Sequence, residues 1–197
     1  LSILRAGTAN ELGSAVSALV SVHLLSILQE WGVALAAAVA LGALVGPAQV
    51  GARAIEMLIG RYHHPIWTMV ASTVLVAAGL GLLSADLPIM AVALVFYGAG
   101  IGIESIARGT LPLALFGASG YATVIGRLAM PSLLAQAASP VIGAFLMQRV
   151  GANGTLTTLL GVAVLDVVLV MTLLVWMRSI NHKSNLSHNE ECSGTAS

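Results

Sequence analysis

Residues 155–177 read TLTTLLGVAVLDVVLVMTLLVWM, a run of 23 residues with one charged side chain, Asp166. A helix rises 1.5 Å per residue, so this run covers about 35 Å, which matches a bilayer hydrocarbon core of about 30 Å. The run lacks the alternation of apolar and polar residues that is typical of a membrane strand, and open strands would leave backbone groups unpaired in lipid. The stretch therefore predicts a transmembrane helix.

Further apolar stretches of similar length precede this one, at residues 12–28, 33–50, 66–83, 87–103 and 128–147. They account for a composition in which 58% of the 197 residues are hydrophobic and 8% are charged, against about 25% charged in an ordinary soluble domain. We predict an all-α membrane protein with six transmembrane helices in residues 1–178. The polar residues 179–197 are predicted to form a disordered cytoplasmic tail.

The basic residues predict the orientation of these helices. Six crossings place both termini on one side, and seven of the eight Lys and Arg residues fall on that side, with Arg149 opposite. Because positive residues concentrate in the cytoplasm, we expect both termini there and residues 29–32, 84–86 and 148–154 outside. The seven are Arg5, Arg53, Arg61, Arg108, Arg127, Arg178 and Lys183.

Charge and cysteine content exclude several kinds of partner. Eight basic residues balance eight acidic ones, so there is no positive surplus to neutralise the phosphates of a nucleic acid. A single cysteine, Cys192, offers neither a disulfide framework nor a thiolate metal site. We expect no nucleic-acid partner, no bound metal and no cofactor.

Two stretches between the predicted helices carry recognisable motifs. Residues 46–53 read GPAQVGAR and are followed by Gly60 and Arg61, while residues 108–112 read RGTLP and lead through Gly126 and Arg127 into a helix with prolines. The first begins in the predicted helix 33–50 and continues into a predicted cytoplasmic loop at residues 51–65, and the second falls in the predicted loop at residues 104–127. Both resemble loops of the major facilitator superfamily of transporters, and the second resembles the carboxyl-terminal half of bacterial members. The first lacks the Asp that usually precedes its Arg.

The resemblance implies that the six helices correspond to helices seven to twelve of a twelve-helix permease, with the amino-terminal half missing. Such a half is a three-plus-three inverted repeat, and the substrate path runs between the halves. The implied function is secondary transport of a small solute by alternating access in the bacterial inner membrane, with no enzymatic step. Membrane lipids and the missing half are the implied partners, and the implied conformational loop consists of Gly46, Pro47, Gln49, Arg53, Gly60 and Arg61.

Polar residues within the predicted helices are candidates for the solute path. In residues 128–147, polar or small residues recur at i, i+4, i+7 and i+11, and prolines stand on either side of Gln136, which indicates an interrupted helix lining a cavity. The alternative is a packing seam with one interhelical amide bond. His23 is a candidate proton relay or solute contact, or else a neutral imidazole bonded to a neighbouring helix. The path candidates are His23, Ser132, Gln136 and Ser139.

Three charged residues are candidates for gating or coupling. Glu104 and Arg108 stand four residues apart, in the order that suits a helical ion pair. This pair either acts as a gate or fixes a helix end. Asp166 has no polar neighbour at helical spacing and is expected to turn inward to a partner or to be neutral. Because ionisable residues in membranes are costly, His23, Glu104 and Asp166 also indicate proton coupling.

Two other classes of protein remain as alternatives. A membrane scaffold or assembly subunit would use the pairs Gly42 and Gly46, and Gly98 and Gly102, to bring helices close. An intramembrane serine protease is a remote alternative, suggested by residues 117–120, GASG, but the last predicted helix supplies no histidine base. The histidines at 63 and 64 are interpreted as loop residues, and Asn153 with Gly154 as a tight outer turn.

Overall fold

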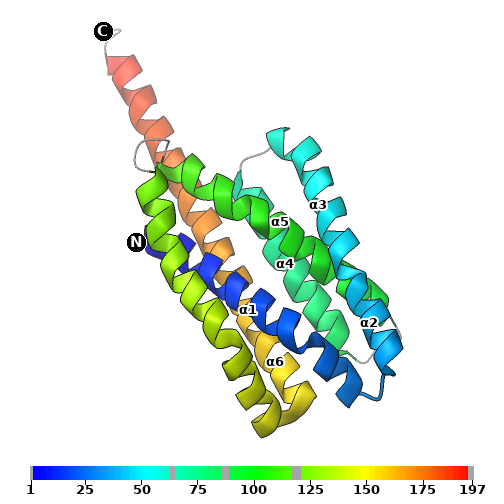
Figure 1. Ribbon diagram of the computed structural model, residues 1–197. Coiled ribbons are helices and arrows are strands. Elements are labelled where there is room, and N and C mark those ends of the chain that lie inside the picture. Colours follow the sequence, from blue (N-terminus) through cyan, green and yellow to red (C-terminus); the bar gives the residue numbers. More distant parts are fainter. Residues whose placement is uncertain (1, 63–64, 86–88, 117–120, 195–197) are drawn as a thin grey trace.

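The computed structural model describes residues 2–62, 65–85, 89–116 and 121–194, and this part of the chain is helical with short turns. Figure 1 shows its elements: α1 (Ser2–Glu30), α2 (Leu35–Ala43), α3 (Val45–Ile59), the 3₁₀ helix η1 (Gly60–Tyr62), α4 (Pro65–Ser84), α5 (Met90–Phe116) and α6 (Tyr121–Gly194). Five helical stretches are long and apolar enough to cross a membrane. The all-helical prediction is confirmed, and the fold is compatible with an integral membrane protein.

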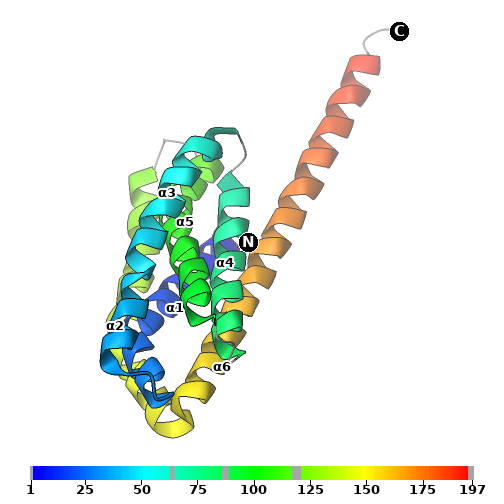
Figure 2. The ribbon, with the colours of Figure 1, turned by 90° about the vertical axis from the view of Figure 1, so that its right-hand side faces the viewer.

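The longest helix, α6, is bent back on itself. Gly151 has φ 68° and ψ −174°, which is not helical, and the chain reverses direction there (Figures 1 and 2). Residues 121–150 and 152–194 therefore form a first and a second arm. The predicted turn at Asn153 and Gly154 was wrong by a few residues, because both already belong to the second arm. The second arm continues to Gly194, and the domain boundary at residue 178 stays a prediction.

The end of α1 holds this reversal in place. A carboxylate oxygen of Glu30, Oε1, accepts a hydrogen bond from the backbone N–H of Ala152 at 3.0 Å. The indole Nε1 of Trp31 donates to Oδ1 of Asn153 at 2.6 Å. The first N–H groups of a helix lack partners within it and favour negative charge. Glu30 therefore stabilises the start of the second arm.

The predicted cytoplasmic loops are largely helical, so both loop predictions were wrong. Helix α3 continues to Ile59 and α5 to Phe116, well beyond the apolar stretches in which they begin. Their polar side chains bond to neighbouring helices: Glu56 Oε1 accepts from Thr68 Oγ1 at 2.5 Å, and Arg53 Nε donates to the carbonyl of Gly102 at 3.3 Å. Hydropathy predicts where the apolar part of a helix ends. It does not predict where the helix itself ends, because polar side chains that bond to neighbouring helices stabilise further turns.

The second predicted helix is divided into α2 and α3 at Leu44. Pro47 lies in the first turn of α3, where it has no N–H to donate to the carbonyl of Ala43, four residues earlier. Its ring also crowds that carbonyl. Proline is a common cause of a helix break, and it explains the division here.

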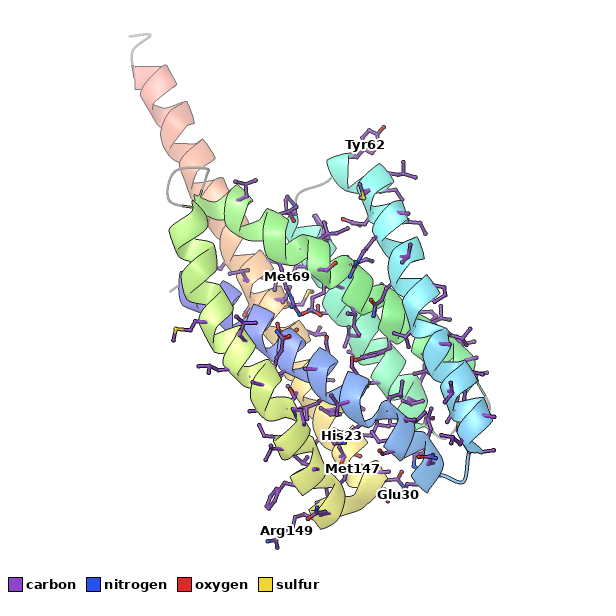
Figure 3. All side chains as sticks on the ribbon, in the orientation of Figure 1. His23, Glu30, Tyr62, Met69, Met147 and Arg149 are labelled. Atoms are coloured by element: carbon purple, nitrogen blue, oxygen red, sulfur yellow. The ribbon has the colours of Figure 1, made fainter. Side chains whose placement is uncertain are left out.

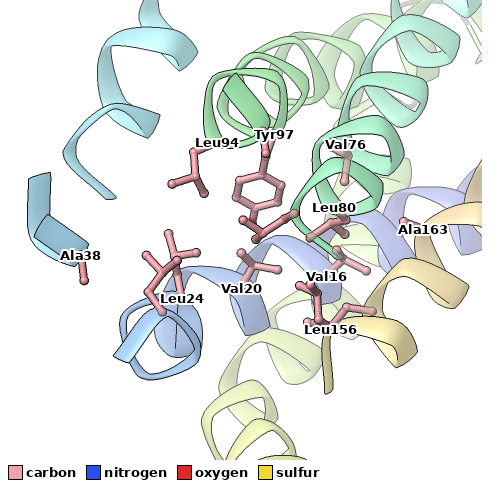
Figure 4. Packing of buried hydrophobic residues seen from close by; sticks show 14 residues of the cluster. Val16, Val20, Leu24, Ala38, Val76, Leu80, Leu94, Tyr97, Leu156 and Ala163 are labelled. Carbon is pink, nitrogen blue, oxygen red and sulfur yellow. The ribbon is translucent and has the colours of Figure 1, made fainter. Parts of the chain in front are cut away.

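The core lies between α1, α4, α5 and the second arm of α6. Figure 4 shows its buried side chains, with Tyr97 of α5 2% exposed and surrounded by aliphatic residues of the other helices. Helix α5 packs against both α3 and α4, while α6 packs against α1 and α4. Burying each aliphatic side chain in a protein interior contributes dispersion contacts that do not depend on water. Labelled members of the cluster include Val16, Val20, Val76, Leu80, Leu94, Leu156 and Ala163.

One of the two predicted glycine seams is present. A Cβ at Gly98 would lie 2.8 Å from the carbonyl oxygen of Val45, and one at Gly102 would lie 2.5 Å from that of Gln49. These glycines let α5 approach the backbone of α3 closely. At Gly42 and Gly46, in contrast, no described residue of the chain lies within 4 Å of a Cβ, so this pair forms no seam within the described bundle.

The ends of the helices gather at two ends of the bundle. Figure 3 places Tyr62, after α3, at the opposite end from Glu30 and Arg149. The turns after α1 and α4 and the reversal in α6 lie at the end of Glu30 (Figures 1 and 3). The three segments predicted to lie outside therefore share one end of the bundle. Their side of the membrane stays a prediction.

Replacing Gly151 by alanine tests the reversal. Its φ and ψ are essentially restricted to glycine, and a non-glycine residue there costs on the order of 1–3 kcal/mol. We expect Gly151→Ala to lower the free energy of unfolding in detergent by that amount. Gly161→Ala, in the same arm with nothing within 4 Å of its Cβ, is the matched control and should not lower it. Equal effects would contradict the turn.

Candidate functional site

A buried carboxylate on α5 connects two helices. Glu104 is 5% exposed, and its Oε1 accepts a hydrogen bond from the guanidinium of Arg108 at 2.7 Å. Its other oxygen, Oε2, lies 3.3 Å from Ser17 Oγ of α1, and that hydroxyl donates its one hydrogen to the nearer carbonyl of Gly13 at 2.8 Å. A Cβ at Gly13 would collide with this carboxyl group, so the glycine makes room for it. The predicted pair with Arg108 is present, and Ser17 extends it to α1.

A second buried carboxylate lies on the second arm of α6. Asp166 is 4% exposed, and within the described part of the chain its Oδ1 has no hydrogen-bond partner. It lines a cavity of about 10 Å³ together with Glu104 of α5 and the hydroxyl residues Ser72 and Thr73 of α4. The inward orientation predicted for Asp166 fits this position. Gly13, Val16, Val76 and Ala163 complete the lining.

The hydroxyl groups in the lining are turned toward their own helix. Ser72 Oγ donates to the carbonyl of Met69 at 2.8 Å, and Thr73 Oγ1 lies 3.2 Å from the same carbonyl and 3.1 Å from that of Val70. Each hydroxyl has one hydrogen to donate and two lone pairs that accept. Because their hydrogens point to backbone carbonyls, the hydroxyl oxygens of Ser72 and Thr73 line the cavity as hydrogen-bond acceptors. Sequence analysis missed Ser17, Ser72 and Thr73, since their side chains are unremarkable until the helices pack.

His23 lies away from this cavity, toward the Glu30 end of α1 (Figure 3). It is partly buried, with Nε2 3.3 Å from the carbonyl oxygen of Pro140 in the first arm of α6. A Cβ at Gly143 would collide with its ring. His23 therefore makes an interhelical contact, and both interpretations of its role stay predictions.

The polar stripe of the first arm occupies two environments. Ser139 is 1% exposed and donates to the carbonyl of Ala135 at 3.0 Å, while Gly143 is buried against α1. Gln136, on the same stripe, is exposed. The side chain of Ser132 lies outside the described residues. The stripe therefore runs from a packed seam to an open surface.

The residues of the predicted conformational loop lie in helices. Gly46, Pro47, Gln49 and Arg53 belong to α3, and Gly60 and Arg61 belong to η1. The backbone of Gln49 packs on Gly102, and Arg53 donates to the carbonyl of the same glycine. A Cβ at Gly60 would lie 3.0 Å from Glu56 Oε1. The side chain of Arg61 is not among those described.

Other positions considered in the sequence give no site. Residues 117–120 and the histidines at 63 and 64 lie outside the described residues. Among the residues that the structure does describe, no three His, Cys, Asp or Glu side chains gather as a metal site. The candidate site is thus the cavity between Glu104 and Asp166.

Comparisons with known proteins give no relative for this chain. No protein-family model matches it, and neither a curated protein nor a solved structure does. The resemblance to the major facilitator superfamily therefore rests on residues 46–53, 60–61 and 108–127 of the sequence alone.

Replacing Glu104 by glutamine tests the ion pair. The variant keeps the shape of the side chain but removes a charge-assisted bond, so we expect the free energy of unfolding to fall by about 2 kcal/mol. The Arg108 side chain is 31% exposed, and solvent screening weakens its interaction with Glu104. Glu104→Gln combined with Arg108→Gln should cost less than the sum of the single variants. If the double variant instead loses as much unfolding free energy as the two single variants together, the two side chains do not interact.

Proposed function

We propose that the chain is the carboxyl-terminal half of a secondary transporter that moves a small solute across a bacterial inner membrane by alternating access. The observation that carries this proposal is the exposure of three polar side chains in predicted transmembrane helices. Ser21 and Ser26 of α1 and Gln136 of α6 are exposed, although they lie in stretches apolar enough to cross a membrane. Polar side chains in a bilayer normally face the bundle interior or a water-filled cavity.

The exposed surface has two characters. Over α3 and the second arm of α6 most exposed side chains are apolar, as on a surface against lipid acyl chains. Arg53, Thr157, Thr158 and Thr172 are exposed there too, and the three threonine hydroxyls donate to carbonyls of their own helix. Over α1 and the first arm of α6, exposed serine and glutamine side chains interrupt the apolar ones. This mixed surface favours contact with water or with another part of a protein. Members of the apolar surface include Val50, Met57, Leu58, Val164, Val168 and Val175.

The buried carboxyl groups of Glu104 and Asp166, with the half-buried Arg108 beside Glu104, add support. Glu104, Arg108 and Asp166 gather among α1, α4, α5 and α6, where ionisable residues are expensive and usually functional. A scaffold built only for packing gains no evident benefit from a carboxylate oxygen without a partner. A transporter uses such groups to bind ions or to bias one conformation.

In this proposal, the mixed surface faces a second set of six helices, and the solute passes between the two sets. The chain forms six crossings when each arm of α6 crosses once. Arg53 links α3 to α5 through Gly102 and helps the half to move as a unit. No chemical step on the solute is involved, and the partners are the other half, membrane lipids and the solute.

Cysteine labelling in native membranes tests the proposal. In a Cys192→Ser background, Ser21→Cys and Gln136→Cys should react with a membrane-impermeant maleimide, because each side chain faces a path that fills with water. Reactivity should change when transported solute is added, since solute shifts the population of access states.

The matched controls are Val50→Cys and Val168→Cys, which are exposed on the apolar surface and should stay unlabelled. If Ser21→Cys and Gln136→Cys are as unreactive as these controls, water does not reach the mixed surface. A membrane scaffold or assembly subunit, with that surface buried against a partner, would then replace the transporter.

A further inference from the structure

The cavity between Glu104 and Asp166 is built to receive a hydrogen-bond donor. Its polar lining consists of two carboxylates and the lone pairs of Ser72 and Thr73, whose hydrogens are directed to Met69 and Val70. A buried acceptor oxygen that receives no hydrogen bond raises the free energy of the folded state. Oδ1 of Asp166 is such a group.

The charges around the cavity do not balance if both carboxyl groups are ionised. The positive Arg108 is paired with Glu104 at 2.7 Å, so an ionised Asp166 would add an uncompensated negative charge. Helix α4 contributes Ser72 and Thr73 to the lining, and α1 contributes Gly13 and Val16. Among the lining residues, therefore, Glu104 is the titratable group that faces Asp166. One monovalent cation would restore neutrality.

The size and lining of the cavity favour a proton over a metal ion. A volume of about 10 Å³ corresponds to roughly one water-sized sphere. Half of the lining residues are glycine, alanine or valine, which offer no side-chain oxygen to a cation. A proton needs one carboxylate oxygen, and it converts Asp166 from an acceptor into the missing donor.

We propose that Asp166 is a proton-binding residue, neutral in the conformation described, whose O–H donates into the cavity that it shares with Glu104. Loss of the proton leaves Asp166 ionised beside Glu104, and the repulsion between the two carboxylates favours a different packing of α5 against α6. The assignment of this proton as the coupling ion rests on the proposed transport function. The binding site itself does not, because it follows from the cavity.

Infrared spectroscopy of the full chain in lipid nanodiscs tests the site. A neutral carboxyl group has its own C=O stretching band, which shifts when its proton is exchanged for deuterium. We expect the wild-type chain to show this band at neutral pH and Asp166→Asn to lose it. Glu30→Gln, which removes an exposed carboxylate far from the cavity, is the matched control and should keep it.

Absence of the band in the wild-type chain at neutral pH, or its survival in Asp166→Asn, would overturn the proposal. If Asp166→Asn does not fold, Asp166→Glu provides the second variant, and it should move the band rather than remove it. Exchanging potassium for sodium at constant pH should leave the band unchanged. Its loss in sodium would show that a metal ion displaces the proton and would contradict the proton assignment.

Transport is measured separately in proteoliposomes that contain both halves. There, Asp166→Asn should abolish the dependence of solute uptake on a pH gradient. The coupling role would be refuted if the wild-type chain shows the infrared band but its solute uptake does not depend on the pH gradient. Failure of the cysteine labelling described above would refute the transporter and leave the infrared result standing.

Discussion

The hydrocarbon core of a bilayer supplies neither hydrogen bonds nor solvation for charge, and the structure follows from that constraint. Apolar runs become helices because a helix satisfies its own backbone groups. Where a helix must begin at the reversal of α6, the carboxylate of Glu30 accepts the N–H of Ala152. Where a charge is buried, Arg108 and Ser17 surround Glu104. Within the described residues, two buried atoms depart from this rule, because Asp166 Oδ1 and Arg108 Nε have no hydrogen-bond partner. The proton site proposed at Asp166 would account for the first of them.

Helix α1 contacts both the carboxyl group of Glu104 and the two arms of α6. Gly13 and Ser17 contact the carboxyl group of Glu104, and Tyr97 donates to the carbonyl of Ser17 at 3.3 Å. Further along, His23 meets the first arm of α6, and Glu30 reaches the start of the second. A change of charge at the cavity would therefore act on a helix that also holds the opposite end of the bundle. This arrangement gives a physical path by which a buried proton would influence which end opens.

The sequence predicted the apolar helices well because their signal is local: length and hydropathy within one stretch. It predicted the pairing of Glu104 with Arg108 for the same reason, since both lie on one helix. It could not supply the surroundings of Asp166, because Ser72, Thr73 and Glu104 come from other helices and meet it only after packing. The continuation of α3 through the predicted loop could not be predicted, because Glu56 bonds to Thr68 on another helix, α4, and meets it only after packing. The glycines show the same limit: Gly98 and Gly102 form a seam, but Gly42 and Gly46 face open space.

The account depends on the chain crossing the bilayer six times, with α6 crossing twice about Gly151. Side-specific labelling in oriented membrane vesicles measures this directly, using single cysteines in a Cys192→Ser background. Arg61→Cys and Arg127→Cys should react with an impermeant reagent from the cytoplasmic side, and Arg149→Cys should react from the opposite side. Labelling of Arg127→Cys and Arg149→Cys from the same side would show that the first arm of α6 does not cross, and would contradict the account.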